Sequence, residues 1–178
     1  NKSRIGANAI LACSLAFLKC SAKNMDKEIY EFLNSSGTYI LPTPLMNIIN
    51  GGAHANNGLD IQEFMIVPAG FPSFREALRA SAEVYHELRR IVRQKGMSTN
   101  VGDEGGVAPS LPSNAAAIEL IVGAIDSAGY EPGRQFFLAL DVAATELYHE
   151  GSYILEREGV TRSGHEMVDL YADLVDKY

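Results

Sequence analysis

The chain has 178 residues, which is enough for one well-buried core and for at most two domains. With 47% hydrophobic and 21% charged residues, its composition is that of a globular protein and excludes a disordered or fibrous one. The formal net charge of −7 argues against a nucleic-acid or anionic-membrane partner, because such partners require a clustered basic face. The same charge is compatible with a bound divalent cation.

The first predicted element is a helix over residues 3–23, which is rich in alanine and leucine and which we expect to be buried on most sides. The apolar run from Ile5 to Leu18 is short and is interrupted by Asn8 and Ser14. A buried helix therefore fits this run better than a membrane span. The chain starts within this pattern, with no initiating methionine and no visible secretory signal, so we expect it to be part of a longer protein.

Cys13 and Cys20 are the only cysteines, and both lie on this predicted helix. Seven residues of helix rise about 10.5 Å, which is farther than the Cα separation that a disulfide allows. Two free thiols fit a reducing compartment, so we expect a cytoplasmic protein in which both side chains fill space in a core.

A domain boundary is predicted near Pro42 and Pro44, after a short helix or turn at residues 27–33 and a turn cluster at residues 34–37. We therefore expect one domain to end at residue 40 and a second to span residues 41–178.

Two short apolar runs, residues 45–49 and 64–67, predict the first two strands of the second domain. The loop between them holds three glycines, three asparagines and one histidine, and it shows no helical pattern. A parallel pair normally needs a helical crossover of about a dozen or more residues, so we predict that these strands are antiparallel. The end of the first strand then meets the start of the second at one rim, where His54, Gln62 and Glu63 should be neighbours.

Helices and one further strand follow in alternation, and two of the helices are preceded by capping boxes that begin at Ser73 and Ser163. The predicted helices are residues 73–96, 113–129 and 163–178, and the predicted strand is residues 136–140. Strands that alternate with amphipathic helices predict an α/β fold. Asp141 comes directly after the last predicted strand, and strand ends are where barrels and open α/β sheets place their sites.

The stretch Val101–Gly106 places the adjacent carboxylates Asp103 and Glu104 inside a glycine-rich turn. Glycine lets a backbone approach a ligand closely or adopt a positive φ. One such turn by itself is more often a solvated surface loop, and His54 alone would more often be an ordinary exposed histidine. Comparable polar clusters at Asn50–His54, Gln62–Glu63 and Asp141 favour a tight anionic site instead, with Asp103 more structural than catalytic.

Several segments of this chain resemble enolases, in the same order and over nearly its whole length. They are Asn47–Ala55, Asp60–Ile66, Gly102–Pro109 and Leu140–Glu146, and the opening Gly6–Ala16 fits the same family. The resemblance implies that residues 41–178 form the first, incomplete part of a (β/α)8 barrel that begins with an antiparallel strand pair. It also implies that residues 1–40 are the helical end of an α+β N-terminal domain.

An enolase, or phosphopyruvate hydratase, is a glycolytic lyase that removes water from 2-phosphoglycerate to give phosphoenolpyruvate with two Mg²⁺ ions. The resemblance implies that Asp141 is a Mg²⁺ ligand and that Glu104 is the general acid for the leaving hydroxyl, with Glu63 in the same acid network. His54 would lie on a mobile loop that closes over the substrate, and Gln62 would help to position it. Glu146 would make a structural contact. A homodimer or larger homo-oligomer is also implied.

Other parts of the family pattern are absent from this sequence, namely the serine loop, two further metal ligands and two active-site lysines. We therefore expect this chain to be a partial enolase that is inactive by itself. Two alternatives stay open. The chain could be a non-catalytic binding or structural module, or it could belong to another enolase-superfamily lyase with a different carboxylate substrate. The second is less favoured because the His54 loop and the pair of Glu63 and Glu104 resemble enolase proper.

Overall fold

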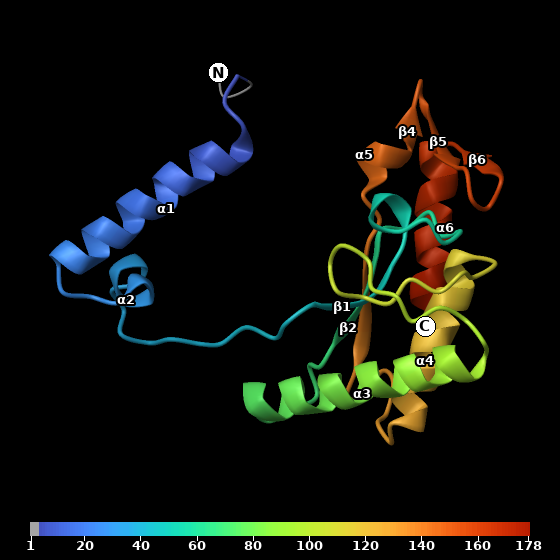
Figure 1. Cartoon of the computed structure of the whole chain (residues 1–178), viewed down its shortest axis with the longest axis horizontal. Helices are drawn as coiled ribbons and strands as arrows, with labels where there is room; N and C mark the ends of the chain where they lie inside the picture. The colour runs from blue at the N-terminus through green and yellow to red at the C-terminus, as the bar shows by residue number, and fades with distance from the viewer. Residues whose placement is uncertain (1–3) are drawn as a thin grey trace. The chain divides into compact units, whose positions relative to one another are not determined.

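The computed structural model describes residues 4–178, and the chain divides into two compact units, Asn1–Leu41 and Pro42–Tyr178. Figure 1 shows the helices and strands of each unit and labels most of them. In the described residues no helix is both long enough and apolar enough to cross a membrane.

The first unit contains the helices α1 (Ala7–Asn24) and α2 (Ile29–Leu33), which pack against each other. The predicted helix is present, but the expectation that it is buried on most sides is wrong, because Ala22 is its only buried residue. The short α2 covers little of the apolar surface of α1, so side chains such as Phe17 stay exposed. Cys13 and Cys20 are both free and exposed, so they do not fill a core as predicted.

A three-stranded antiparallel sheet forms the centre of the second unit, in the order β1 (Met46–Asn50), β2 (Glu63–Val67) and β3 (Phe137–Asp141). The predicted antiparallel pairing of the first two strands is confirmed, and so is the α/β fold. The last strand extends one residue farther than predicted and includes Asp141. The end of β1, the start of β2 and the end of β3 therefore lie at one rim of the sheet.

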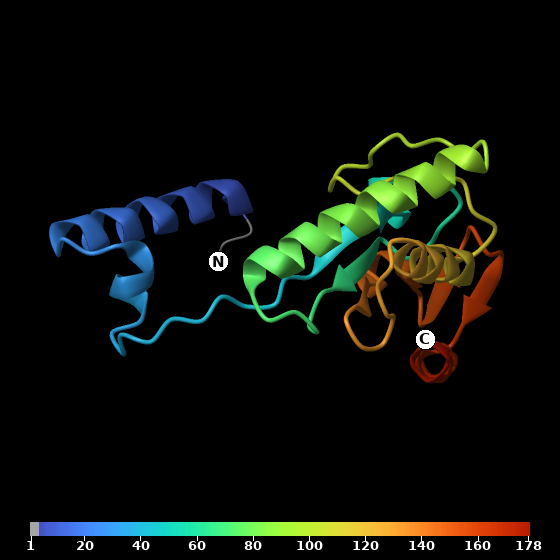
Figure 2. The same ribbon diagram turned by 90° about the horizontal axis from the view of Figure 1, so that it is seen from below.

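Two long helices, α3 (Phe74–Gln94) and α4 (Asn114–Ser127), pack against each other and against the sheet (Figure 2). Each begins at a serine whose hydroxyl accepts a backbone N–H, Ser73 for α3 and Ser113 for α4. Only this half of the capping box predicted at Ser73 is formed, because the Glu76 carboxylate accepts from Arg79. The buried residues of α3 recur every three or four positions, so one stripe of the helix faces the core. This core also contains Phe64 and Ile66 of β2.

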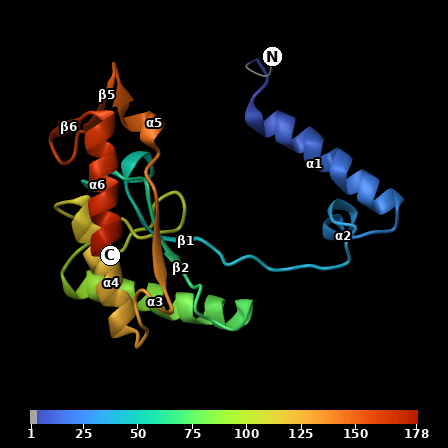
Figure 3. The ribbon, with the colours of Figure 1, turned by 180° about the vertical axis from the view of Figure 1, so that it is seen from behind.

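The rest of the second unit is a small antiparallel sheet flanked by two helices. Its elements are α5 (Ala144–Leu147), β4 (Tyr148–His149), β5 (Ser152–Leu155), β6 (Val160–Arg162) and α6 (Gly164–Lys177). Figure 3 shows α6 beside this sheet. The predicted capping box at Ser163 is present, and the last turn of α6 is joined to α4 because the Tyr178 hydroxyl and Lys177 both donate to Glu119. Val175, in the last turns of this helix, is exposed.

Candidate active site

The polar rim of the main sheet is built from the strand ends. Glu63, the first residue of β2, pairs on one side with Asn50 at the end of β1. On the other side it pairs with Asp141 at the end of β3. Because Glu63 lies between these two residues, the sheet register itself gathers carboxylates from β2 and β3 at one place.

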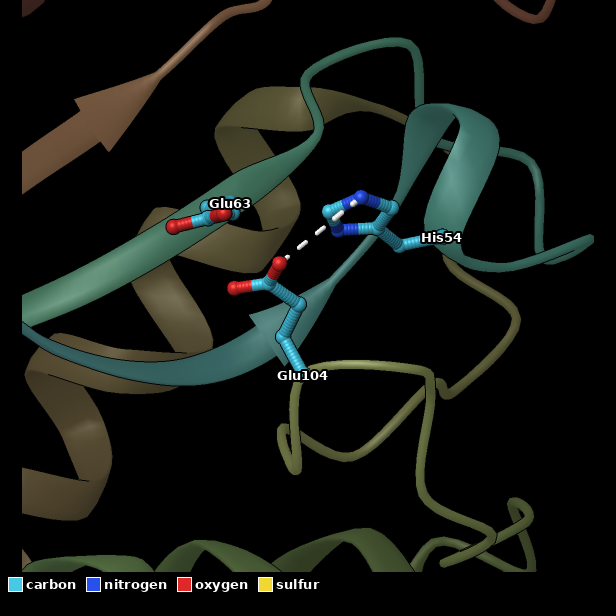
Figure 4. Close-up of side chains that lie close together, drawn as sticks. All are labelled: His54, Glu63 and Glu104. Atoms are coloured by element: carbon cyan, nitrogen blue, oxygen red, sulfur yellow. Dashed lines mark ion pairs between the residues drawn. The ribbon is translucent and has the colours of Figure 1, made fainter. Parts of the chain in front are cut away.

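His54, Glu63 and Glu104 form one group at this rim, and Figure 4 shows their side chains together. One ligand atom from each lies within 4.8 Å of the others. The imidazole Nε2 of His54 is 4.0 Å from Oε1 of Glu104, and the Glu104 side chain is about half exposed. The structure thus brings together three of the residues that sequence analysis selected, from three separate segments of the chain.

Glu63 is the residue of this group whose pKa is shifted. Its pKa is raised above the ordinary value of 4.5, first by burial, then by hydrogen bonding with Glu104, and then by the negative charges of Glu104 and Asp141. The positive charge of protonated His54 acts in the opposite direction and lowers it. A carboxyl group with a raised pKa beside a second carboxylate is suited to hold and transfer a proton.

The Glu104 turn is held against β1 by backbone hydrogen bonds and by close packing on Asn50. Asn50, which is fully buried, donates its backbone N–H to the carbonyl of Val107 at 3.0 Å. A Cβ at Gly106 would lie only 2.2 Å from Oδ1 of Asn50, and one at Gly102 would lie 2.7 Å from its Cβ. Glycine is required at both positions because the turn lies directly on the Asn50 side chain.

The segment that carries His54 is folded back onto the start of β2. The N–H of Gly51 donates to the carbonyl of Gln62 at 2.8 Å, and the N–H of His54 donates to the carbonyl of Gly51 at 3.0 Å. The side-chain amide of Asn57 donates to the carbonyl of Asn50 at 2.7 Å. Asn50 thus contacts both the His54 segment and the Glu104 turn. Sequence analysis included Asn50 in the Asn50–His54 cluster but assigned it no role.

Gln62 is not part of the histidine–carboxylate group. It lines a neighbouring cavity of about 460 Å³, together with Asp60, Glu146 and Arg157. Gln62 lies in the bend that precedes β2, and Glu63 is the first residue of that strand. Sequence analysis expected Gln62 and Glu63 to act at one place, and Gln62 lies beside Gly52 and Ala53, next to His54 in the chain. Glu146, expected to be structural, is exposed on the wall of this cavity.

Asp141 is exposed at the end of β3, where its Oδ1 accepts the N–H of Ala143 at 2.9 Å. The Asp141 carboxylate is an oxygen donor of the type that Mg²⁺ prefers. It therefore fits a Mg²⁺ site chemically, with the Glu63 carboxylate as its neighbour across the strand pair. The His54, Glu63 and Glu104 group also has donor atoms close enough to hold a metal ion, but its imidazole is better matched to zinc or a transition metal.

Carboxylates gathered at the strand ends of a helix-covered sheet are typical of barrel enzymes. Residues 38–178 match the family model of the enolase C-terminal TIM barrel domain, and the chain belongs to the enolase family. This family is one of lyases. A TIM barrel closes with eight strands, so the three strands of the main sheet form part of such a wall.

Proposed function

We propose that this chain supplies the acid half of a phosphopyruvate hydratase active site, which eliminates water from 2-phosphoglycerate to give phosphoenolpyruvate. The observation that carries the proposal is the group of His54, Glu63 and Glu104 at the strand rim of an enolase-family barrel domain. The raised pKa of Glu63 supports it, because the elimination needs a proton donor for the departing hydroxyl.

In this reaction a base removes the proton from C2 of the substrate, and the C3–oxygen bond breaks as the double bond forms. The hydroxyl leaves as water when it receives a proton, and we assign that donation to Glu104. A carboxylate oxygen of Glu63 lies within 4.8 Å of one of Glu104, and Glu104 raises the pKa of Glu63, so we assign one shared proton to the two carboxyl groups. The Glu104 side chain is more exposed than that of His54, and this exposure suits a group that must reach a bound substrate.

Asp141 would hold Mg²⁺ in this proposal. Mg²⁺, when bound, supplies positive charge that stabilises the negative charge on the substrate carboxylate. The Asp141 carboxylate supplies one oxygen ligand, and Mg²⁺ takes its others from water, substrate or further carboxylates. His54 would contact the substrate from the segment that folds over the start of β2, and Gln62 would contact it from the adjoining cavity. The backbone hydrogen bonds that join Gly51 to His54 and to Gln62 support these two assignments.

The test uses a complete enolase in which this segment replaces the matching region, together with the chain alone. We expect the complete enzyme to convert 2-phosphoglycerate and the chain alone to show no turnover, because the family's two catalytic lysines do not occur in it. Loss of turnover in the complete enzyme would contradict the proposal. Turnover of a different carboxylate substrate in its place would identify another lyase of the superfamily, and folding without any turnover would favour a binding module.

A further inference from the structure

Asp60, Asn114 and Glu158 form a closed ring of hydrogen bonds. Asp60 lies two residues before Gln62 in the chain. Asp60 and Asn114 are 4% and 5% exposed, and Glu158 is partly buried. Buried polar groups are costly unless they are hydrogen-bonded, so a buried carboxylate needs well-placed donors. The three residues come from separate elements: the segment before β2, the first turn of α4 and the turn between β5 and β6.

Asp60 uses both of its carboxylate oxygens in this ring. Its Oδ1 accepts the backbone N–H of Arg157 at 2.9 Å, and its Oδ2 accepts the backbone N–H of Glu158 at 3.0 Å. The two donors are consecutive residues of the β5–β6 turn, so the carboxylate fixes the position and the orientation of that turn. Hydrogen bonds to an ionised carboxylate are stronger than those between neutral groups.

Asn114 closes the ring with its side chain and its backbone. Its Oδ1 accepts the N–H groups of Asp60 and Ile61, both at 3.1 Å. Its backbone N–H and its side-chain amide both donate to Oε1 of Glu158, at 2.8 and 2.9 Å. The backbone of Asp60–Ile61 is therefore held by α4 on one side and by the β5–β6 turn on the other.

We propose that Asp60, Asn114 and Glu158 are positioning residues that set the placement of Gln62 and Glu63 at the rim. The role of Gln62 and Glu63 in this proposal rests on the proposed function. The hydrogen bonds that position them do not depend on it. Gln62 and Glu63 follow Ile61 directly, so a displacement of the held backbone is passed to them within two peptide units. Asp60, Gln62 and Arg157 also line the same cavity of about 460 Å³, so the ring forms part of its wall.

The two carboxylates of the ring respond differently to replacement by the amide of the same shape. Asp60→Asn converts one accepting oxygen into an NH₂ group that faces a backbone N–H, so one bond is lost and two donors oppose each other. Glu158→Gln keeps the single oxygen that both groups of Asn114 use, so the ring is retained. Glu158→Ala removes that oxygen and is the second disruptive variant.

The experiment records amide NMR spectra and hydrogen exchange of the full chain and these three variants. In Asp60→Asn and Glu158→Ala we expect the amides of Asp60 and Ile61 to exchange roughly ten- to hundredfold faster. We also expect shifted signals from the Gln62 side-chain amide and the Glu63 backbone. Glu158→Gln should leave all of these signals as in the unmodified chain, and the amides of Phe64 and Ile66 in the core should stay protected in every variant.

Unmoved Gln62 and Glu63 signals in Asp60→Asn, despite faster exchange, would overturn the proposal, because the ring would then only stabilise the fold. The same conclusion follows if both disruptive variants unfold while Glu158→Gln folds. Equal disturbance by Glu158→Gln and Glu158→Ala would also overturn it. None of these measurements needs turnover. A failure of the hydratase assay therefore leaves the NMR result unaffected, and a negative NMR result leaves the hydratase assay unaffected.

Discussion

Glu63 and Asp141 are direct cross-strand partners, the first residue of β2 opposite the last residue of β3. Like charges that face each other across a strand pair repel, and the Asp141 charge is one cause of the raised pKa of Glu63. A bound cation would remove this repulsion. The register of the sheet therefore provides a physical reason for a divalent ion at the rim.

Asp141→Asn in a complete enolase that carries this segment should raise the Mg²⁺ concentration needed for activity by on the order of 100-fold. The amide keeps the shape of the side chain but loses the charge that binds a hard cation. Activity titrated against Mg²⁺ for both proteins measures the effect. Superimposable curves would remove Asp141 from the metal site.

Glu63→Gln should increase the thermal stability of the chain in a pH-dependent way when divalent metal is absent. Because the folded-state pKa of Glu63 is raised, the folded chain binds this proton more tightly than the unfolded chain does. The contribution of Glu63 to the stability of the unmodified chain therefore falls as the pH rises from 4.5, the ordinary value, through the folded-state pKa. Below this pH range Glu63 is protonated in both the folded and the unfolded chain, so its ionisation does not destabilise the folded chain there.

Melting temperatures of the two proteins across this pH range, with a chelator present, check the prediction. The advantage of Glu63→Gln should grow through the window and then become constant. Asp103→Asn is the control for the removal of one carboxylate from this region, because Asp103 is exposed. A difference between Glu63→Gln and the unmodified chain that is the same at every pH would contradict the assigned burial of Glu63.

The elements of the main sheet and its covering helices could be predicted because their signals are local. Serine caps and apolar stripes lie within one element, and the short loop before β2 decides the strand direction. The small sheet of β4, β5 and β6 was not predicted, because strands of two to four residues are too short for a periodic pattern. The burial of α1 was predicted wrongly, since apolar residues show what a helix could bury but not whether a partner covers it.

The site residues were partly predictable for a related reason. Glu63 begins a strand, Glu104 precedes Gly105, and His54 follows Gly51–Gly52 within three residues, and those features are visible in a sequence. The burial of Asn50 depends on a turn more than 50 residues away, and it is known only when Gly102 and Gly106 are seen to pack on it. The bonds of the Asp60, Asn114 and Glu158 ring join residues 44 to 98 positions apart, so no local pattern contains them.

Glu104→Gln in the complete enolase should slow dehydration much more than exchange of the C2 proton. Glu104 is assigned to the departing hydroxyl, whereas the base that removes the C2 proton is a different group. Loss of a positioned acid typically costs roughly 10² to 10⁴ in rate. Product formation and deuterium exchange at C2, measured on the same samples, separate the two steps.

Asp103→Asn is the matched control for this variant, since it changes the adjacent carboxylate of the same turn and should leave both rates close to those of the unmodified enzyme. Equal losses of exchange and dehydration in Glu104→Gln would indicate that Glu104 maintains the structure of the site. Equal effects of the Glu104 and Asp103 variants would indicate that only the charge of the turn matters.

Gly106→Ala should destabilise the second unit by roughly 1–3 kcal/mol, the usual cost of forcing extra atoms into a packed interior. The added Cβ would lie 2.2 Å from Oδ1 of Asn50 and 2.9 Å from the backbone of Ile48 and Ile49. Strand backbone cannot move aside as the end of a flexible side chain can, so the Glu104 turn has to shift.

Gly123→Ala is the control, because a Cβ at this position in α4 meets no atom within 4 Å. Alanine is the better helix former, so that variant should gain about 0.5–1 kcal/mol. Denaturant unfolding of the three proteins gives both values. If Gly106→Ala is as stable as the unmodified chain, the turn does not lie on Asn50, and the described path from β1 to Glu104 is wrong.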